Sequence, residues 1–416
     1  MRTRLVTCIV VSILLATFLS GAVVFAPSVM AQGEPPISRS PFLHLLAYTP
    51  DMRSDDYPLA GVISYVNLHE IARIGNVTVS DLETFEKDED IQIAWRWAMS
   101  RITTPPEFVA YERALMPTMP EVVGMNWFAI NAALEFGVSP RNGVFIDFRL
   151  GDDSSGLDLD MVTKALTKRG FAVQDVESVP VWHRFDDGKM GTPDRFRGDP
   201  FGADIGLPER IQLYNGEFAG LVGNGRNWTL AKAMIGAVKE TGADLLDSPD
   251  YAVLAQALTD PAYYPKDTGE QLSDLLQVYI IPPIQGESTP SSAGDPLPPY
   301  MLMAMADRQK GSQQFHQIVL IYPSRDFALR ASDILLGRLR TFLPEALITE
   351  HQVEFTEPLV YTAKDGWSAA IVGVHYPLPA DVLNSQTGKM NLQGEIYRYL
   401  SYKLWQGQLT PIGLKP

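Results

Sequence analysis

The chain has 416 residues, of which 34 are Lys or Arg and 49 are Asp or Glu, so its formal net charge at pH 7 is −15. A surface of this sign repels phosphate backbones and anionic lipid headgroups, which excludes nucleic acid as the expected partner. Cys8 is the one cysteine, so a chain cut after it carries no thiol, no disulfide and no cysteine metal site.

The start of the chain has the three parts of an export signal. Arg2 and Arg4 form a positive region, residues 5–26 are uncharged and largely apolar, and small residues at Val29 and Ala31 fit cleavage after position 31. We therefore expect the protein to work outside the cytoplasm, either secreted or on the outer face of the membrane.

The competing interpretation of the same segment is an uncleaved membrane anchor. At about 1.5 Å per residue, the uncharged run reaches roughly 33 Å, enough to cross a hydrocarbon core about 30 Å thick. Ser12, Thr17 and Ser20 dilute the apolar run, which favours cleavage. The protein is expected to contact a membrane only through this segment, and only if the segment is retained.

A helical part follows the leader. Ser80 and Glu83 stand three residues apart before the stretch that runs to residue 102, a spacing typical of a capping box. We interpret Trp95, Trp97 and Met99 in this stretch as core residues rather than as a cofactor site, because aromatic residues at such spacing usually pack a core.

From residue 143 onward, apolar runs of strand length alternate with helical patterns. Gly and Pro residues, together with the helical or alternating period of the apolar residues, define these elements. Strands are predicted at 144–148, 171–176, 179–185, 211–214, 218–222, 275–281, 300–306, 315–322, 353–361 and 368–375, and helices at 161–170, 228–241, after Ser248, 327–342 and 392–405.

These elements predict an α+β fold. Two blocks with a similar order of strands and helices suggest two related halves of mixed or antiparallel sheet with helices on one face, and a ferredoxin-type split unit is one form that fits each half. The expected organisation is a signal peptide or anchor at 1–31, a flexible lead at 32–41, an α+β lobe with a helical start at 42–281, a Pro/Ser/Gly-rich linker or loop at 282–299, and a second α+β lobe at 300–416.

The common chemical motifs are incomplete. A turn at Gly223 and Gly225 resembles the start of a dinucleotide-binding loop, but Trp228 occupies the position of the third glycine. His69 begins a zinc-protease pattern, but Arg73 stands where the second histidine would bind the metal. The sequence therefore predicts no catalytic, cofactor-binding or metal-binding residue.

One segment combines the side-chain types that bind polar ligands. Trp182, His183, Arg184, Asp186 and Asp187 place an aromatic ring, a titratable ring, a guanidinium and two carboxylates at the end of a predicted strand. Such a mixture suits a sugar or another small polar ligand. The alternative is an edge strand that runs into a charged turn.

By elimination, the sequence favours an exported, non-enzymatic protein of the cell envelope that binds a small polar ligand or another envelope protein. The first alternative is a hydrolase of an envelope or extracellular polymer that uses carboxylates brought together by the fold. The second is a scaffold subunit held by an uncleaved anchor.

Overall fold

The computed structural model describes residues 40–53, 61–139, 141–148, 156–187, 199–202, 206–260, 274–282, 296–378, 394–409 and 414. The chain divides into two units, Met1–Ser40 and Pro41–Pro416. Almost all of the first unit, and with it the predicted signal or anchor, lies outside the described residues, so the account below concerns the second. Within the described ranges, no helix is both long and apolar enough to span a bilayer.

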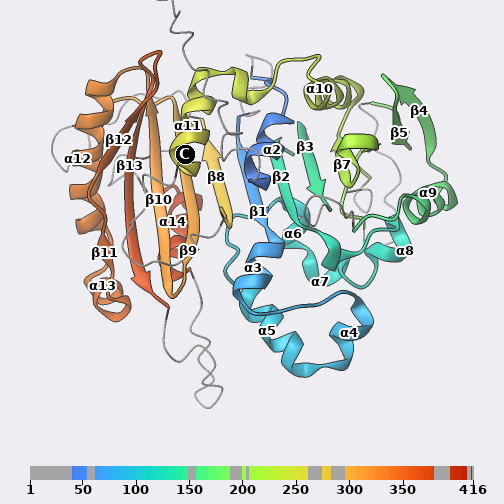
Figure 1. The fold of residues 1–416 in the computed structure, drawn as a ribbon, viewed down its shortest axis with the longest axis horizontal. Coiled ribbons are helices and arrows are strands. Elements are labelled where there is room, and N and C mark those ends of the chain that lie inside the picture. Colours follow the sequence, from blue (N-terminus) through green and yellow to red (C-terminus); the bar gives the residue numbers. More distant parts are fainter. Residues whose placement is uncertain are drawn as a thin grey trace, which may run out of the picture. The chain divides into compact units, whose positions relative to one another are not determined.

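The described residues of the second unit form one sheet of 13 strands (Figure 1). The strand order is β11-β13-β10-β9-β8-β1-β2-β3-β7-β6-β5-β4, with β12 also paired to β13, and all of these pairs are antiparallel. The strands are β1 (Ile63–Asn67), β2 (Ala132–Val138), β3 (Arg141–Asp147), β4 (Ala172–Val176), β5 (Val179–His183), β6 (Arg210–Leu213), β7 (Leu221–Gly225), β8 (Gln277–Ile281), β9 (Leu302–Lys310), β10 (Gln313–Tyr322), β11 (Glu354–Phe355), β12 (Leu359–Thr362) and β13 (Ser368–Pro377).

Helices precede, connect and follow these strands (Figure 1). Several begin at an Asp or Asn whose side chain accepts a hydrogen bond from a backbone N–H of the first turn, as Asp158 does for α9. The α-helices are α2 (Pro41–Ala47), α3 (Leu68–Ile74), α4 (Leu82–Lys87), α5 (Glu89–Met99), α6 (Glu107–Ala110), α7 (Glu112–Leu115), α8 (Met119–Val123), α9 (Leu159–Lys168), α10 (Trp228–Val238), α11 (Pro249–Thr259), α12 (Arg325–Phe342), α13 (Glu345–His351) and α14 (Glu395–Trp405).

The helices cover both faces of the sheet. In β9, Leu302 and Ala304 belong to the same buried cluster as Leu254 of α11, whereas Met303 belongs to the cluster that contains Leu335 of α12. Every residue of β9 is buried, as expected for a strand packed on two sides. The α+β class with an antiparallel sheet is confirmed, but the placement of all helices on one face was wrong.

The two blocks that the sequence suggested as halves meet within one sheet. β8 and β9 are hydrogen-bonded neighbours in which Ile281 lies opposite Met303, although residues 283–295 between them lie outside the described part of the chain. In a split βαβ unit, the two parallel strands that the helix joins are separated by an antiparallel strand. β10 and β12 have this relation, since both are antiparallel to β13 between them and α12 lies between them in the chain, so the ferredoxin-type unit stays a prediction.

A buried ion pair fixes the chain after α5 to the sheet. Arg101 binds Asp307 of β9 with two hydrogen bonds, from Nε to Oδ2 and from Nη2 to Oδ1, each 2.7 Å long. Gln277 of β8 donates from Nε2 to Asp307 Oδ2 at 3.0 Å and to the Arg101 carbonyl oxygen at 2.9 Å. Burial alone would raise the pKa of Asp307, but the charges of Arg101 and His316 outweigh it and hold this pKa well below its usual range.

Candidate ligand-binding site

The predicted polar segment at the end of β5 does not gather on one side of the sheet. Successive side chains of a strand point to opposite faces. Trp182 is accordingly buried in the cluster that contains Val162 of α9, whereas the His183 ring lies 5.1 Å from the ring of Trp228 at the start of α10. Trp182 and His183 therefore pack against different parts of the protein on opposite faces of the sheet.

The charged members of this segment bind neighbouring parts of the protein. Asp187 accepts a hydrogen bond of 2.7 Å from Arg210 Nη2 and one of 3.0 Å from the backbone N–H of Trp228. The Arg184 guanidinium lies over the Phe185 ring, 5.2 Å from its centroid. Asp187 thus stabilises the first turn of α10 and pairs with the buried Arg210 guanidinium, which favours a structural role for this carboxylate.

His183 and Asp186 lie close enough to interact electrostatically. Burial, followed by the charge of Arg210, lowers the pKa of His183, and the Asp186 carboxylate offsets only part of this effect. A role for the segment in ligand binding stays a prediction. Its described contacts are those expected for a charged turn at the end of a strand.

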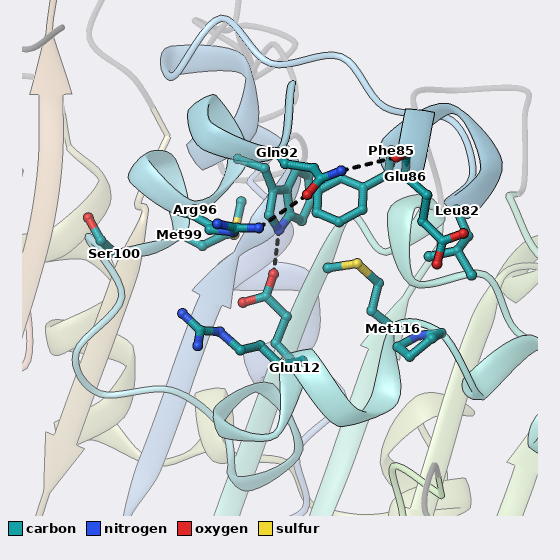
Figure 2. Close-up of a pocket in the computed structure, with 12 residues that line it drawn as sticks. Leu82, Phe85, Glu86, Gln92, Arg96, Met99, Ser100, Glu112 and Met116 are labelled. Atoms are coloured by element: carbon teal, nitrogen blue, oxygen red, sulfur yellow. Dashed lines mark hydrogen bonds between the residues drawn. The ribbon is translucent and has the colours of Figure 1, made fainter. Parts of the chain in front are cut away.

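A more promising site is a cavity of about 690 Å³ between α4, α5 and the region of α7 (Figure 2). Its lining comes from two stretches of the helical part, one before and one after Arg101. The lining residues are Leu82, Phe85, Glu86, Gln92, Trp95, Arg96, Met99, Ser100, Glu112, Arg113, Met116 and Pro117.

The break between α4 and α5 shapes this cavity. Asp81 caps α4 by accepting from the Thr84 N–H at 2.7 Å, and Asp88 caps α5 by accepting from the Asp90 and Ile91 N–H groups at 3.0 and 3.1 Å. Asp88 itself has an extended backbone, so one helix cannot run through it. The predicted capping box at Ser80 and Glu83 is therefore replaced by two helices with caps at Asp81 and Asp88.

Aromatic contacts hold the two helices together beside the cavity. The Phe85 and Trp95 rings pack edge to face with centroids 6.3 Å apart, and Phe128 contacts both, at 5.4 Å from Phe85 and 5.1 Å from Trp95. Trp95 is almost fully buried, and so are Met99 and Met116. The apolar wall thus combines fixed aromatic rings with two flexible thioether side chains that adapt to a ligand's shape.

Glu112 is the inner polar group of the cavity. Its Oε1 accepts a hydrogen bond from the indole Nε1–H of Trp95, which Figure 2 marks as a dashed line at Glu112. Burial raises the pKa of Glu112, although the Trp95 hydrogen bond and the nearby Arg113 charge favour the ionised form. The inner carboxyl group therefore takes up a proton more readily than an exposed glutamate does.

Two arginines belong to the outer lining. Arg96 donates from Nη2 to Gln92 Oε1 at 3.1 Å, and Gln92 donates in turn from Nε2 to the Glu86 carbonyl oxygen at 3.2 Å (Figure 2). Arg96 and Arg113 are both exposed. Because the Arg96 partner is a neutral amide, its positive charge is not compensated by this contact.

Metal binding has little support in the part of the chain that the structure describes. No group of three or more His, Asp or Glu side chains there is arranged to hold an ion. The cavity lining contributes two carboxylates, Glu86 and Glu112, and the inner one is bound to the indole of Trp95.

Sequence reasoning found part of this site but not its role. Trp95 and Met99 were predicted to be core residues, and they are buried, yet they also line the cavity. The available signal was the presence of Asp88 between the two apolar patterns, since Asp in such a place favours a new helix start. Glu112 and Met116 carried no signal, because their place beside α5 depends on tertiary packing.

Comparison with known proteins gives no assignment. No family model matches this chain, and no curated protein has a significant sequence match. Among solved structures, crystal forms III and IV of TP0453 are each 9% identical with a TM-score of 0.31, and they cover 80% and 79% of this chain and 93% of that one. Crystal form I is 8% identical with a TM-score of 0.30 and covers 80% and 92%, respectively. Similarity at this level supports no functional argument.

Proposed function

We propose that this chain is an exported protein of the cell envelope that acts as a ligand-binding module rather than as an enzyme, and that the cavity beside α4, α5 and α7 is its binding site. The observation that carries this proposal is the cavity itself. It has an apolar wall built from Phe85, Trp95, Met99 and Met116, with a few polar groups around it. Sites for small molecules typically combine these features within about 300–1,000 Å³.

Export is supported by the N-terminal sequence. Two arginines, a long uncharged run and small residues before position 32 are the parts of a cleavable leader. N-terminal sequencing of the protein from its native host tests this proposal. A mature chain that begins at Gln32 supports it, whereas a cytosolic chain that retains Met1 contradicts it.

Ligand binding is tested by identifying what the native protein carries. Native mass spectrometry of protein purified from its own envelope should show a bound small molecule. Met116→Trp fills the cavity and should remove that molecule, while Met161→Trp, at an exposed position on α9, should retain it. Thermal melts establish that both variants are folded, and Leu82→Trp provides a second way to fill the cavity.

Two results would contradict this assignment. One is native protein that carries no ligand and takes none from an extract of its own envelope. The other is ligand binding that is unchanged in folded Met116→Trp and Leu82→Trp proteins.

Within this cavity, the raised pKa of Glu112 favours the alternative, a carboxylate-dependent hydrolase, since a general acid needs such a shift. Glycoside cleavage requires a second carboxyl group across the scissile bond. Glu86 is the other carboxylate of the lining, and it is exposed. Glu112→Gln distinguishes the two functions, because a hydrolase would lose turnover and a binding protein would retain its ligand.

A further inference from the structure

We infer that the ligand of this cavity is an amphiphilic carboxylate, with an apolar body against Phe85, Trp95, Met99 and Met116 and an anionic head group at Arg96 and Arg113. This inference rests on the proposed function and specifies the chemical class of the ligand. The shared chemistry is a single carboxylate on an alkyl or aryl body.

The wall of the cavity selects an apolar body. Phe85 and Trp95 lie on α4 and α5, and Met116 reaches the same space from the chain after α7 (Figure 2). Met99 and Met116 are each less than one tenth exposed, so a ligand that reaches them leaves water. Each methylene group buried in this way strengthens binding about fourfold until the apolar space is filled.

The charges of the lining favour an anion. The lining contains two guanidinium groups, those of Arg96 and Arg113, and two carboxyl groups. Of the carboxyl groups, Glu86 is exposed and Glu112 accepts a hydrogen bond from the Trp95 indole N–H. A guanidinium also matches the planar, two-oxygen geometry of a carboxylate.

A quaternary ammonium ligand is the main competitor, because aromatic rings and carboxylates together bind such cations. Here the inner carboxyl group is Glu112, and its Oε1 already accepts the hydrogen bond of Trp95. Burial also disfavours its charged form, and the Arg113 charge offsets the carboxylate when it is ionised, so its attraction for a cation is reduced. The two arginines would repel the same ligand.

Calorimetric titration of the delipidated full-length mature protein tests the inference. The probes are linear carboxylates from hexanoate to tetradecanoate, phenylalkanoates, the matched primary alcohols and the matched alkyltrimethylammonium ions. We expect the carboxylates to bind more tightly than the alcohols and the ammonium ions to bind most weakly. The linear and phenyl series distinguish an alkyl ligand from an aryl ligand.

Charge variants provide the second readout. Arg96→Gln and Arg113→Gln should each weaken carboxylate binding by up to about fivefold, the range for exposed ion pairs, and leave alcohol binding unchanged. The matched control is Arg325→Gln, an exposed arginine at the start of α12, which should bind like the wild type.

The outcomes separate this inference from the proposed function. Equal binding of carboxylates and alcohols, or tighter binding of the ammonium ions, overturns the carboxylate assignment and leaves a binding cavity in place. If none of the probe classes binds saturably, the carboxylate assignment is overturned. The proposed function is then overturned as well only if the native protein also carries no ligand.

Discussion

Asp307→Asn tests how strongly the buried ion pair attaches the helical part to the sheet. The substitution leaves the Arg101 guanidinium almost fully buried without its carboxylate, although Gln309 Oε1 and the Arg308 carbonyl oxygen still accept hydrogen bonds from it. Removal of one partner from a buried ion pair costs about 3–5 kcal/mol. Domains of this kind are stable by about 5–15 kcal/mol in total, so the variant should lose a large share of its stability.

Urea denaturation followed by circular dichroism measures this loss as a lower midpoint. Asp333→Asn, at an exposed position of α12, is the matched control and should change the free energy of unfolding by less than about 0.5 kcal/mol. The double variant Arg101→Met with Asp307→Leu should recover much of the lost stability, because no charge is then left buried. A loss below about 1 kcal/mol in Asp307→Asn would refute the reasoning.

Three further predictions concern other positions. Gly124→Ala should destabilise the protein by at least about 1–2 kcal/mol, because φ is +72° and the new Cβ would lie 2.5 Å from backbone atoms of α9. Gly337 lies in open space within α12, so Gly337→Ala should stabilise the protein by up to about 1 kcal/mol. Thermal melts of the two variants measure both effects. Burial, and then the Asp199 carboxylate, raise the pKa of Glu209 well above its usual value, so its contribution to stability is present at low pH and is lost as pH rises through that pKa. Glu209→Gln should therefore gain stability relative to the wild type in urea titrations as pH increases, and a constant difference across pH would be inconsistent with a protonated Glu209. Carboxylate binding should weaken as Glu112, which shares the cavity lining with Arg96 and Arg113, ionises with rising pH, and Glu112→Gln should remove this part of the pH dependence in calorimetry.

The alternating strands and helices after residue 143 were largely predictable because their sequence signals are local. The helix expected at 327–342 is α12, and the strand expected at 144–148 overlaps β3. The strand expected at 353–361 is divided into β11 and β12 with Pro358 between them. Proline has no N–H to contribute to a strand ladder, so this division could also have been predicted.

The early part of the chain was harder to predict. β1, Ile63–Asn67, lies between β2 and β8 in the sheet, and it was not recognised among the surrounding helices. Its five residues are all buried, so Ser64 and Asn67 interrupt the apolar pattern of a strand packed on both faces. Ser64 donates to the Thr104 carbonyl oxygen, and the Asn67 side chain accepts from the Glu70 N–H. The Asn67 contact is a local helix cap, whereas the Thr104 partner of Ser64 is 40 positions away and meets it only after folding.

The cavity was outside the reach of sequence reasoning for the same reason. Trp95 and Glu112 stand 17 positions apart, and nothing in either pattern indicates that an indole N–H will meet a carboxyl group. The polar segment at the end of β5 is the opposite case. Its composition suggested a binding site, but its residues divide between two faces of the sheet. Composition therefore identified side chains with suitable chemistry, while packing determined which of them lie together.

The most direct test of a ligand site beside α4, α5 and α7 is calorimetric titration of dodecanoate into the wild-type, Met116→Trp and Met161→Trp proteins. The account predicts saturable binding to one site in the wild type and in Met161→Trp, and none in a folded Met116→Trp protein. Equal binding in all three would place the ligand elsewhere and contradict the account.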